Sequence, residues 1–132
     1  MSEGELEHGQ LFFAHETPRE SQRRMIDDGI ETLKEGGFLL AAAPTGIGKT
    51  AAALASSLTV ANHYSFGKEI PKILFLTGRQ SQHRIVVDTI REINNRIPQG
   101  FSKIKLVDII GRRSMCKNCL LYTSPSPRDR VR

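Results

Sequence analysis

The chain has 132 residues, 39% of them hydrophobic, and a formal net charge of +5. That length allows one small domain at most, and the mild basic excess is compatible with a nucleic-acid partner without requiring one. The chain contains no run of roughly 18 apolar residues, and this excludes a membrane span. Its polar start carries no secretion signal, and its two cysteines argue against a disulfide framework. We therefore expect no membrane partner and a cytoplasmic protein, or a nuclear one in a eukaryote.

The start of the chain is acidic and polar, and residues 1–10 are expected to be a disordered lead. Residues 10–14 follow as a short strand or an apolar clamp. Thr17 and Glu20 then form a T-x-x-E capping box, which predicts the start of a helix. This helix should continue to about Glu35 and end at the glycine pair that follows.

One face of this first helix is apolar except at its start. At 100° per residue, five positions share that face: Arg19, Gln22, Ile26, Ile30 and Leu33. Two interpretations of the polar pair stay open. Either Arg19 and Gln22 extend from the edge of the core, or Gln22 points at a ligand.

Two apolar stretches without alternation, residues 38–42 and 73–77, predict buried strands of a parallel sheet. Residues 104–110 predict a third strand, with Lys105 near an edge of the sheet. Helices are predicted between them, over 51–61 and 80–97. In the second of these, Val86, Ile90, Ile93 and Ile97 form the apolar face, and Arg84, Asp88, Arg91 and Asn95 lie opposite. The alternating order predicts an α/β fold with right-handed crossovers.

Residues 43–50, with the sequence APTGIGKT, are the most informative segment, and we call them the phosphate loop. They join a predicted strand to a predicted helix, which is the context that a phosphate-binding loop requires. Glycines let the backbone approach phosphate oxygens, and the helix that opens at Gly48 adds the positive end of its dipole. Lys49 is expected to reach the outer phosphates, and the Thr50 hydroxyl to bind magnesium.

The residues expected to hold the nucleotide in this segment are Thr45, Gly46, Ile47, Gly48, Lys49, Thr50 and Ala51. Lys49 and Thr50 are also the expected catalytic residues. The alternative is a glycine-rich turn that only links two elements. Ala43 stands where the general pattern begins with glycine, which a residue at a strand end tolerates.

The character of the chain changes after Asn118. Residues 119–132 have neither helical nor strand periodicity, and one reverse translation of 119–129 resembles the transposase end and adapter used in sequencing libraries. We therefore expect residues 119–132 to be a non-native tail. A genuine disordered tail rich in serine and proline is the alternative.

Several segments together resemble one helicase family. The phosphate loop resembles motif I of superfamily 2 helicases. Upstream, Arg19, Gln22 and Met25 resemble the R-x-x-Q…M element of the XPD and DinG helicases. In that family the glutamine reads the adenine edge, because a carboxamide donates and accepts at once.

Two downstream segments extend the resemblance to about residues 11–118. Thr77, Arg79 and Gln82 resemble motif Ia, usually written close to T-R-T-x-x-Q, although the order here is Thr-Gly-Arg. Residues 111–116 resemble the segment that introduces the first cysteine of the family's iron–sulfur domain. Cys116 stands in that position.

The resemblance implies that residues 11–118 form the N-terminal part of a RecA-like P-loop NTPase motor domain. It implies ATP and Mg²⁺ as cofactors, with Arg19 and Gln22 at the nucleotide. It also implies a [4Fe–4S] cluster in the intact protein, with Cys116 as its first ligand. The implied partner is single-stranded DNA, along which the intact protein would move 5′ to 3′. Its contacts with the DNA would come from Thr77, Arg79 and Gln82. Repair, transcription-associated opening and replication restart all stay open as pathways.

Interpretations without a functional role remain open for some of these residues. Arg79 is also consistent with a solvated loop arginine, and Cys116 with a buried or free thiol. Cys116 and Cys119 have C-x-x-C spacing, which is accidental if Cys119 belongs to the non-native tail. Single histidines, His83 among them, are interpreted as surface residues.

The acidic pair that activates water in a Walker B or DEAH box is missing after every apolar run. Asp108 is interpreted as a polar strand residue near the sheet end. We therefore expect the 132-residue chain neither to hydrolyse ATP nor to unwind DNA. The rival functions are another phosphate-loop enzyme, such as a small-molecule kinase, and a non-catalytic binding module for nucleotides or nucleic acid.

Overall fold

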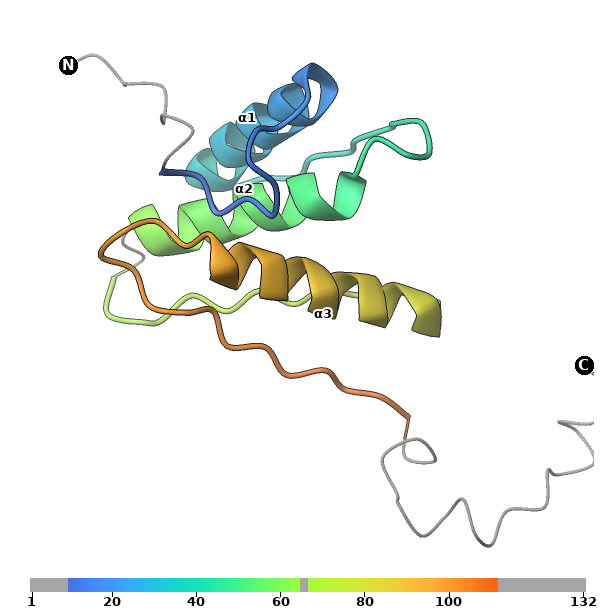
Figure 1. Cartoon of the computed structure of the whole chain (residues 1–132). Helices are drawn as coiled ribbons and strands as arrows, with labels where there is room; N and C mark the ends of the chain where they lie inside the picture. Colours follow the sequence, from blue (N-terminus) through green and yellow to red (C-terminus); the bar gives the residue numbers. More distant parts are fainter. Residues whose placement is uncertain (1–9, 65–66, 112–132) are drawn as a thin grey trace, which may run out of the picture.

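The computed structural model describes residues 10–64 and 67–111. Three helices make up the regular structure of this part: α1 at Glu20–Glu35, α2 at Lys49–His63 and α3 at Gln80–Asn95. Helix α2 lies between the other two and packs against both (Figure 1). None of the helices described here combines the length and apolarity that a bilayer crossing needs.

Helix α1 confirms most of its sequence prediction, but its start lies further along the chain. The N-cap is Arg19, and its backbone N–H donates to the Gln22 side-chain oxygen at 3.1 Å. The reciprocal contact of a capping box is therefore supplied by Gln22, not by Glu20. The helix ends at Gly36, whose φ of 77° is left-handed, as the glycine stop signal predicts.

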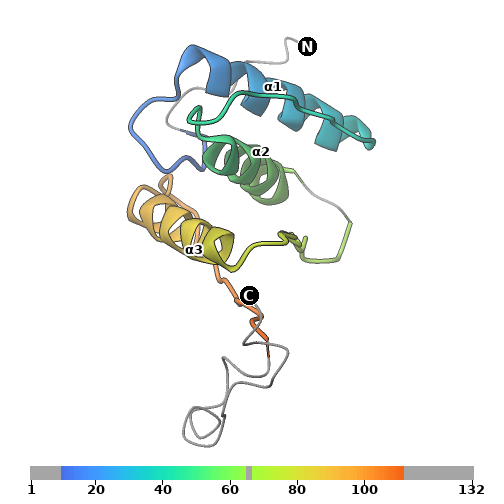
Figure 2. The ribbon, with the colours of Figure 1, turned by 90° about the vertical axis from the view of Figure 1, so that its right-hand side faces the viewer.

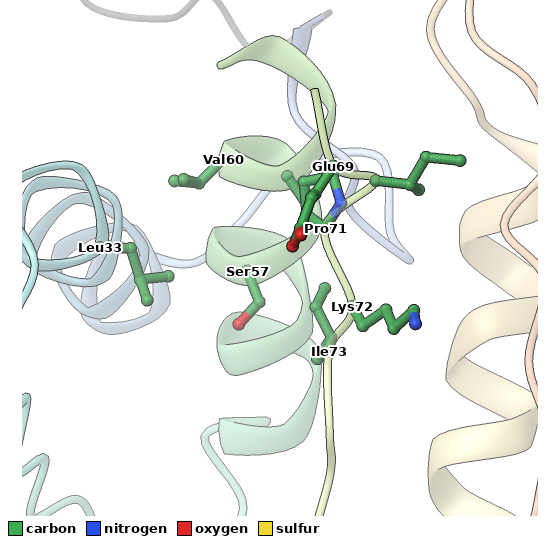
Figure 3. A pocket seen from close by; sticks show the side chains of 9 residues that line it. Leu33, Ser57, Val60, Glu69, Pro71, Lys72 and Ile73 are labelled. Atoms are coloured by element: carbon green, nitrogen blue, oxygen red, sulfur yellow. The ribbon is translucent and has the colours of Figure 1, made fainter. Parts of the chain in front are cut away.

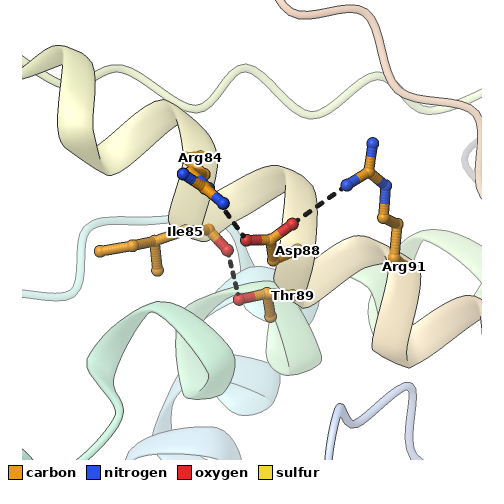
Figure 4. Close-up of polar contacts among 5 residues, drawn as sticks. All are labelled: Arg84, Ile85, Asp88, Thr89 and Arg91. Carbon is orange, nitrogen blue, oxygen red and sulfur yellow. Dashed lines mark hydrogen bonds and ion pairs between the residues drawn. The ribbon is translucent and has the colours of Figure 1, made fainter.

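Helix α3 confirms its predicted apolar face, because Val86, Ile90 and Ile93 are buried and Ile97 packs against the same cluster. The opposite face carries a small ion network (Figure 4). Asp88 accepts from Arg91 at 3.1 Å and lies 3.8 Å from Arg84. These side chains are largely exposed, so their network contributes little to stability.

The core consists of two apolar clusters, one on each side of α2. The segment 11–14 contributes alternate residues to both: Leu11 and Phe13 join the cluster shared with α1, and Phe12 and Ala14 join the cluster shared with α3. The Phe12 backbone N–H donates to the Thr59 hydroxyl at 3.2 Å. The segment therefore acts as the predicted clamp, because period-two alternation lets four residues fill two clusters.

Helices α1 and α2 approach each other closely at one point. A Cβ atom placed on Gly29 would lie 2.8 Å from both Cβ and Oγ of Ser56. Glycine and serine at this crossing therefore set the distance between the two helices.

The predicted parallel sheet is wrong for the described part of the chain. Residues 38–42, 73–77 and 104–110 contain no strand, and no backbone-to-backbone hydrogen bond among the described residues involves them. Each stretch is extended. It follows a helix and runs back alongside the helices in the opposite direction (Figures 1 and 2). The partial RecA-like α/β class is therefore corrected to three packed helices joined by extended connections.

The exposure of residues 38–42 and 73–77 contradicts the prediction that these two stretches are buried. Phe38 and Leu40 are fully exposed, and Leu74 and Leu76 are mostly exposed. Apolar and β-branched residues favour extended backbone, but a strand also needs a hydrogen-bonded neighbour about 4.8 Å away. The composition of a stretch indicates that its backbone is extended, but it carries no information about whether a neighbouring strand is present.

Candidate phosphate-binding site

The phosphate loop leads from the extended stretch 38–42 into the first turn of α2. Two of its residues have left-handed backbones, Gly46 with a φ of 87° and Gly48 with a φ of 79°. Only glycine adopts these angles without strain. The two glycines of the motif therefore stand where the chain has to turn into the helix.

The start of α2 leaves backbone donors without acceptors. The first hydrogen bond of the helix joins the Ala52 N–H to the Gly48 carbonyl at 3.1 Å. Within the described ranges, the N–H groups of Lys49, Thr50 and Ala51 make no hydrogen bond. Free N–H groups at a helix N-terminus carry partial positive charge and favour an anion.

The Lys49 side chain folds back over the phosphate loop. Its Nζ donates to the Ala43 carbonyl at 2.8 Å and forms no ion pair with an acidic residue in the part of the chain described here. An exposed ammonium ion held only by a neutral carbonyl exchanges that contact readily for a phosphate oxygen, because charge-assisted bonds are stronger.

The expected magnesium ligand, Thr50, lies in the first turn of α2 and is half-buried. Across residues 10–64 and 67–111, no group of three or more His, Cys, Asp or Glu side chains is placed to hold a metal ion. A single hydroxyl nevertheless fits the way Mg²⁺ binds beside phosphates, where nucleotide oxygens and water supply the other ligands. That Thr50 binds magnesium stays a prediction.

Two residues of α1's N-terminus contact the phosphate loop. Gln22 is only 4% exposed, and its side-chain nitrogen donates to the Gly48 carbonyl at 3.4 Å. Arg19 Nη1 donates to the Gly46 carbonyl at 3.3 Å. The structure thus brings together two segments, separated by more than 20 residues, that the sequence predicted to share one site. That Gln22 reads adenine stays a prediction.

The predicted DNA-contacting residues lie at the start of α3. Arg79 is its N-cap, and the backbone N–H of Arg79 donates to the Thr77 hydroxyl at 3.4 Å. The Gln82 N–H donates to the Arg79 carbonyl at 3.0 Å. The Thr77 hydroxyl therefore accepts one bond within the turn and keeps its own donor. The Arg79 side chain is exposed and makes no ion pair with another described residue. The N-termini of α2 and α3 lie at the same end of the helix layer (Figure 1).

Two polar contacts that sequence analysis missed fasten the stretch 104–110 to α3. His83 Nδ1 lies 2.6 Å from a carboxylate oxygen of Asp108. The Asn94 carboxamide donates to the Ile104 carbonyl at 3.0 Å and accepts from its N–H at 2.7 Å. His83 and Asp108 are separated by 25 residues and belong to no motif, so no local sequence signal points to this pair.

A separate hollow of about 800 Å³ lies beside α1 and α2 (Figure 3). It is lined by Leu33, Ser57, Val60, Ala61 and the segment 69–73. Its charged residues are Glu69 and Lys72, and it includes no residue of the phosphate loop. The hollow is therefore distinct from the candidate phosphate site. Cys116, the predicted cluster ligand, and the predicted tail 119–132 lie outside the described residues.

Comparisons of the chain with family models, with curated proteins and with solved structures give no match.

Proposed function

We propose that residues 43–50 bind the phosphates of ATP together with Mg²⁺. The observation that carries this proposal is the start of α2, where two left-handed glycines precede three N–H groups that have no acceptor among residues 10–64 and 67–111. The Lys49 ammonium lies over the same loop. Backbone N–H groups and an exposed ammonium offer complementary charge to a triphosphate.

In the intact protein, this site serves an ATP-dependent 5′–3′ DNA helicase of the XPD/DinG kind. The support is the resemblance of four segments and the packing of the R-x-x-Q residues Arg19 and Gln22 on the phosphate loop. Arg79, the exposed N-cap of α3, supplies a cation for a DNA phosphate, and the N-termini of α2 and α3 lie at the same end of the helix layer (Figure 1). Lys49 and Mg²⁺ on Thr50 would offset the charge that develops during phosphoryl transfer.

Calorimetric titration of Mg²⁺·ATP into the 132-residue chain tests nucleotide binding. We expect Lys49→Ala to weaken binding by about tenfold or more, because a charge-assisted bond to phosphate is lost. Lys103→Ala removes the same charge at an exposed position far along the chain and serves as the control. Equal affinities of the two variants would contradict the proposal.

Hydrolysis by this chain is a separate question. We expect no Mg²⁺-dependent ATP turnover, with or without single-stranded DNA, because no Walker B acidic pair follows an apolar run in the sequence. A phosphate-release assay checks this expectation, and turnover abolished by Lys49→Ala would contradict it. A small-molecule kinase remains the alternative enzyme.

A further inference from the structure

The Gln22 side chain links the beginnings of two helices. Its oxygen accepts from the Arg19 N–H at 3.1 Å and caps α1. Its nitrogen donates to the Gly48 carbonyl at 3.4 Å, at the N-cap of α2. At 4% exposure, the carboxamide is shielded from solvent while both of its ends are occupied.

The contact with Gly48 is close. A Cβ atom on residue 48 would lie 2.3 Å from the Gln22 nitrogen, so the end of the Gln22 side chain would have to move away from the Gly48 carbonyl. Glycine at position 48 therefore suits the left-handed φ of 79° and leaves Gln22 in place.

Holding a carbonyl group also orients the next N–H. Because a peptide unit is planar and trans, the Gly48 carbonyl and the Lys49 N–H point in opposite directions from one rigid plane. The Gly48 carbonyl accepts from the Ala52 N–H at 3.1 Å and from the Gln22 nitrogen at 3.4 Å, so Gln22 is the second of two donors that hold this carbonyl and, with it, the direction of the Lys49 N–H. Arg19 acts in the same way on the Gly46 carbonyl and thereby on the Ile47 N–H.

We propose that Gln22 is a positioning residue, which orients the phosphate loop for a triphosphate by holding the Gly48 carbonyl. This inference rests on the proposed function and assigns Gln22 a role in binding the phosphates, not the base. Fixed donors bind an anion more tightly than mobile ones, because less conformational entropy is lost on binding. The contribution is therefore the same for ATP, GTP and inorganic tripolyphosphate.

The test compares Gln22→Glu with Ser21→Glu in the 132-residue chain. Glutamate at position 22 keeps the oxygen that caps α1 but replaces the donor to Gly48 with a second acceptor. Glutamate at position 21 makes the same charge change in the same helical turn, at an exposed site without this contact. Affinities for ATP, GTP and tripolyphosphate are measured with Mg²⁺ by calorimetry.

We expect Gln22→Glu to weaken all three ligands by a similar factor of about ten, and Ser21→Glu by much less. In ligand-free protein, the Lys49 amide resonance should move in Gln22→Glu and stay in place in Ser21→Glu. The thermal midpoint of unfolding should be lower in Gln22→Glu than in Ser21→Glu, because the carboxylate at position 22 is buried beside the Gly48 carbonyl. Affinities are therefore compared at a temperature well below both midpoints. A movement confined to Lys49 and its neighbours in the phosphate loop, with the amide resonances of Gly29 and Ser56 at the α1–α2 crossing unchanged, is the expected result. A purely structural role of Gln22 would move both groups of resonances.

A loss for ATP alone, with tripolyphosphate unaffected, would overturn the inference and identify Gln22 as a base-reading residue. Equal losses in both variants would overturn it as well, because charge alone would then explain them. Absence of any ligand binding by the wild-type chain would overturn the proposed function itself, and this inference with it.

Discussion

At the scale of single residues, Gly48 is constrained by its backbone angle and by a close neighbour, whereas Gly46 is constrained by its backbone angle alone. Both glycines have left-handed backbones, with φ of 79° and 87°. A Cβ atom would strike Gln22 at position 48, whereas nothing lies within 4 Å at position 46. Substitution of Gly46 therefore measures backbone strain alone, whereas substitution of Gly48 measures backbone strain together with the contact to Gln22.

We expect Gly46→Ala to lower the free energy of unfolding by about 1 kcal/mol, and Gly48→Ala by more, about 2–3 kcal/mol. Gly48→Ala should also weaken triphosphate binding more than Gly46→Ala. Urea denaturation followed by circular dichroism measures the first difference. Gly78→Ala, at an open site with ordinary φ, is the control. Equal effects at positions 46 and 48 would show that Gln22 exerts no steric constraint.

The residues of the phosphate loop could be predicted from the sequence, because the spacing of Gly46, Gly48 and Lys49 reflects local backbone requirements. The bonds from Gln22 to the Arg19 N–H and the Gly48 carbonyl could not. Helical periodicity placed Gln22 on the inner face of α1 but did not show what that face meets.

At the scale of elements, the crossing of α1 and α2 depends on the small residues Gly29 and Ser56. Alanine inside a helix is intrinsically favoured over glycine by about 1 kcal/mol. Packing opposes this preference here, because a Cβ on Gly29 would lie 2.8 Å from Cβ and Oγ of Ser56.

We therefore expect Gly29→Ala to destabilise the chain by about 1–3 kcal/mol, because the two helices have to move apart. The double variant Gly29→Ala, Ser56→Gly should recover much of the loss. Urea denaturation of the two single variants and the double variant gives the coupling energy. Additive effects of the two substitutions would show that this crossing is not tightly packed.

The stretch 104–110 depends on Asn94 for its attachment to α3. Both hydrogen bonds of Asn94 end on Ile104, at 2.7 and 3.0 Å. We expect Asn94→Ala to cost about 1–2 kcal/mol and to accelerate hydrogen exchange of the Ile104 amide. Asn95→Ala, at the exposed neighbouring position, is the control. Unchanged exchange at Ile104 in Asn94→Ala would contradict this account.

Sequence analysis succeeded with helices and failed with strands for one physical reason. Helix signals are local: the stop at Gly36 and the apolar face of α3 depend on residues within a few turns. The stretches 38–42 and 73–77 have strand-like composition, but a ladder depends on a partner far away in the sequence. No property of the stretch itself supplies that partner.

At the scale of the whole molecule, the extended stretches leave large apolar side chains in water. Leu74 and Leu76 are 78% and 79% exposed, and Phe38 and Leu40 are fully exposed. Extended apolar segments without backbone partners promote association between copies. The double variant Leu74→Lys, Leu76→Lys should therefore stay monomeric at concentrations where the wild-type chain associates.

Light scattering during size-exclusion chromatography, at several loading concentrations, checks this expectation. The three helices should persist in the variant, because neither leucine belongs to the two core clusters. Lys72→Leu, Lys103→Leu adds apolar surface without touching these residues and should not reduce association. Equal association of the wild type and the lysine variant would contradict a role of residues 73–77.

The central claim is that the phosphate loop binds a triphosphate, and the most direct test is a titration of Mg²⁺·ATP into isotope-labelled chain, followed by amide resonances. We predict the largest shifts at residues 46–51, where free N–H groups and left-handed glycines meet. Small shifts should follow at Arg19 and Gln22, which contact the loop. Shifts confined to the hollow around Leu33 and Val60, or no shifts at all, would contradict the claim.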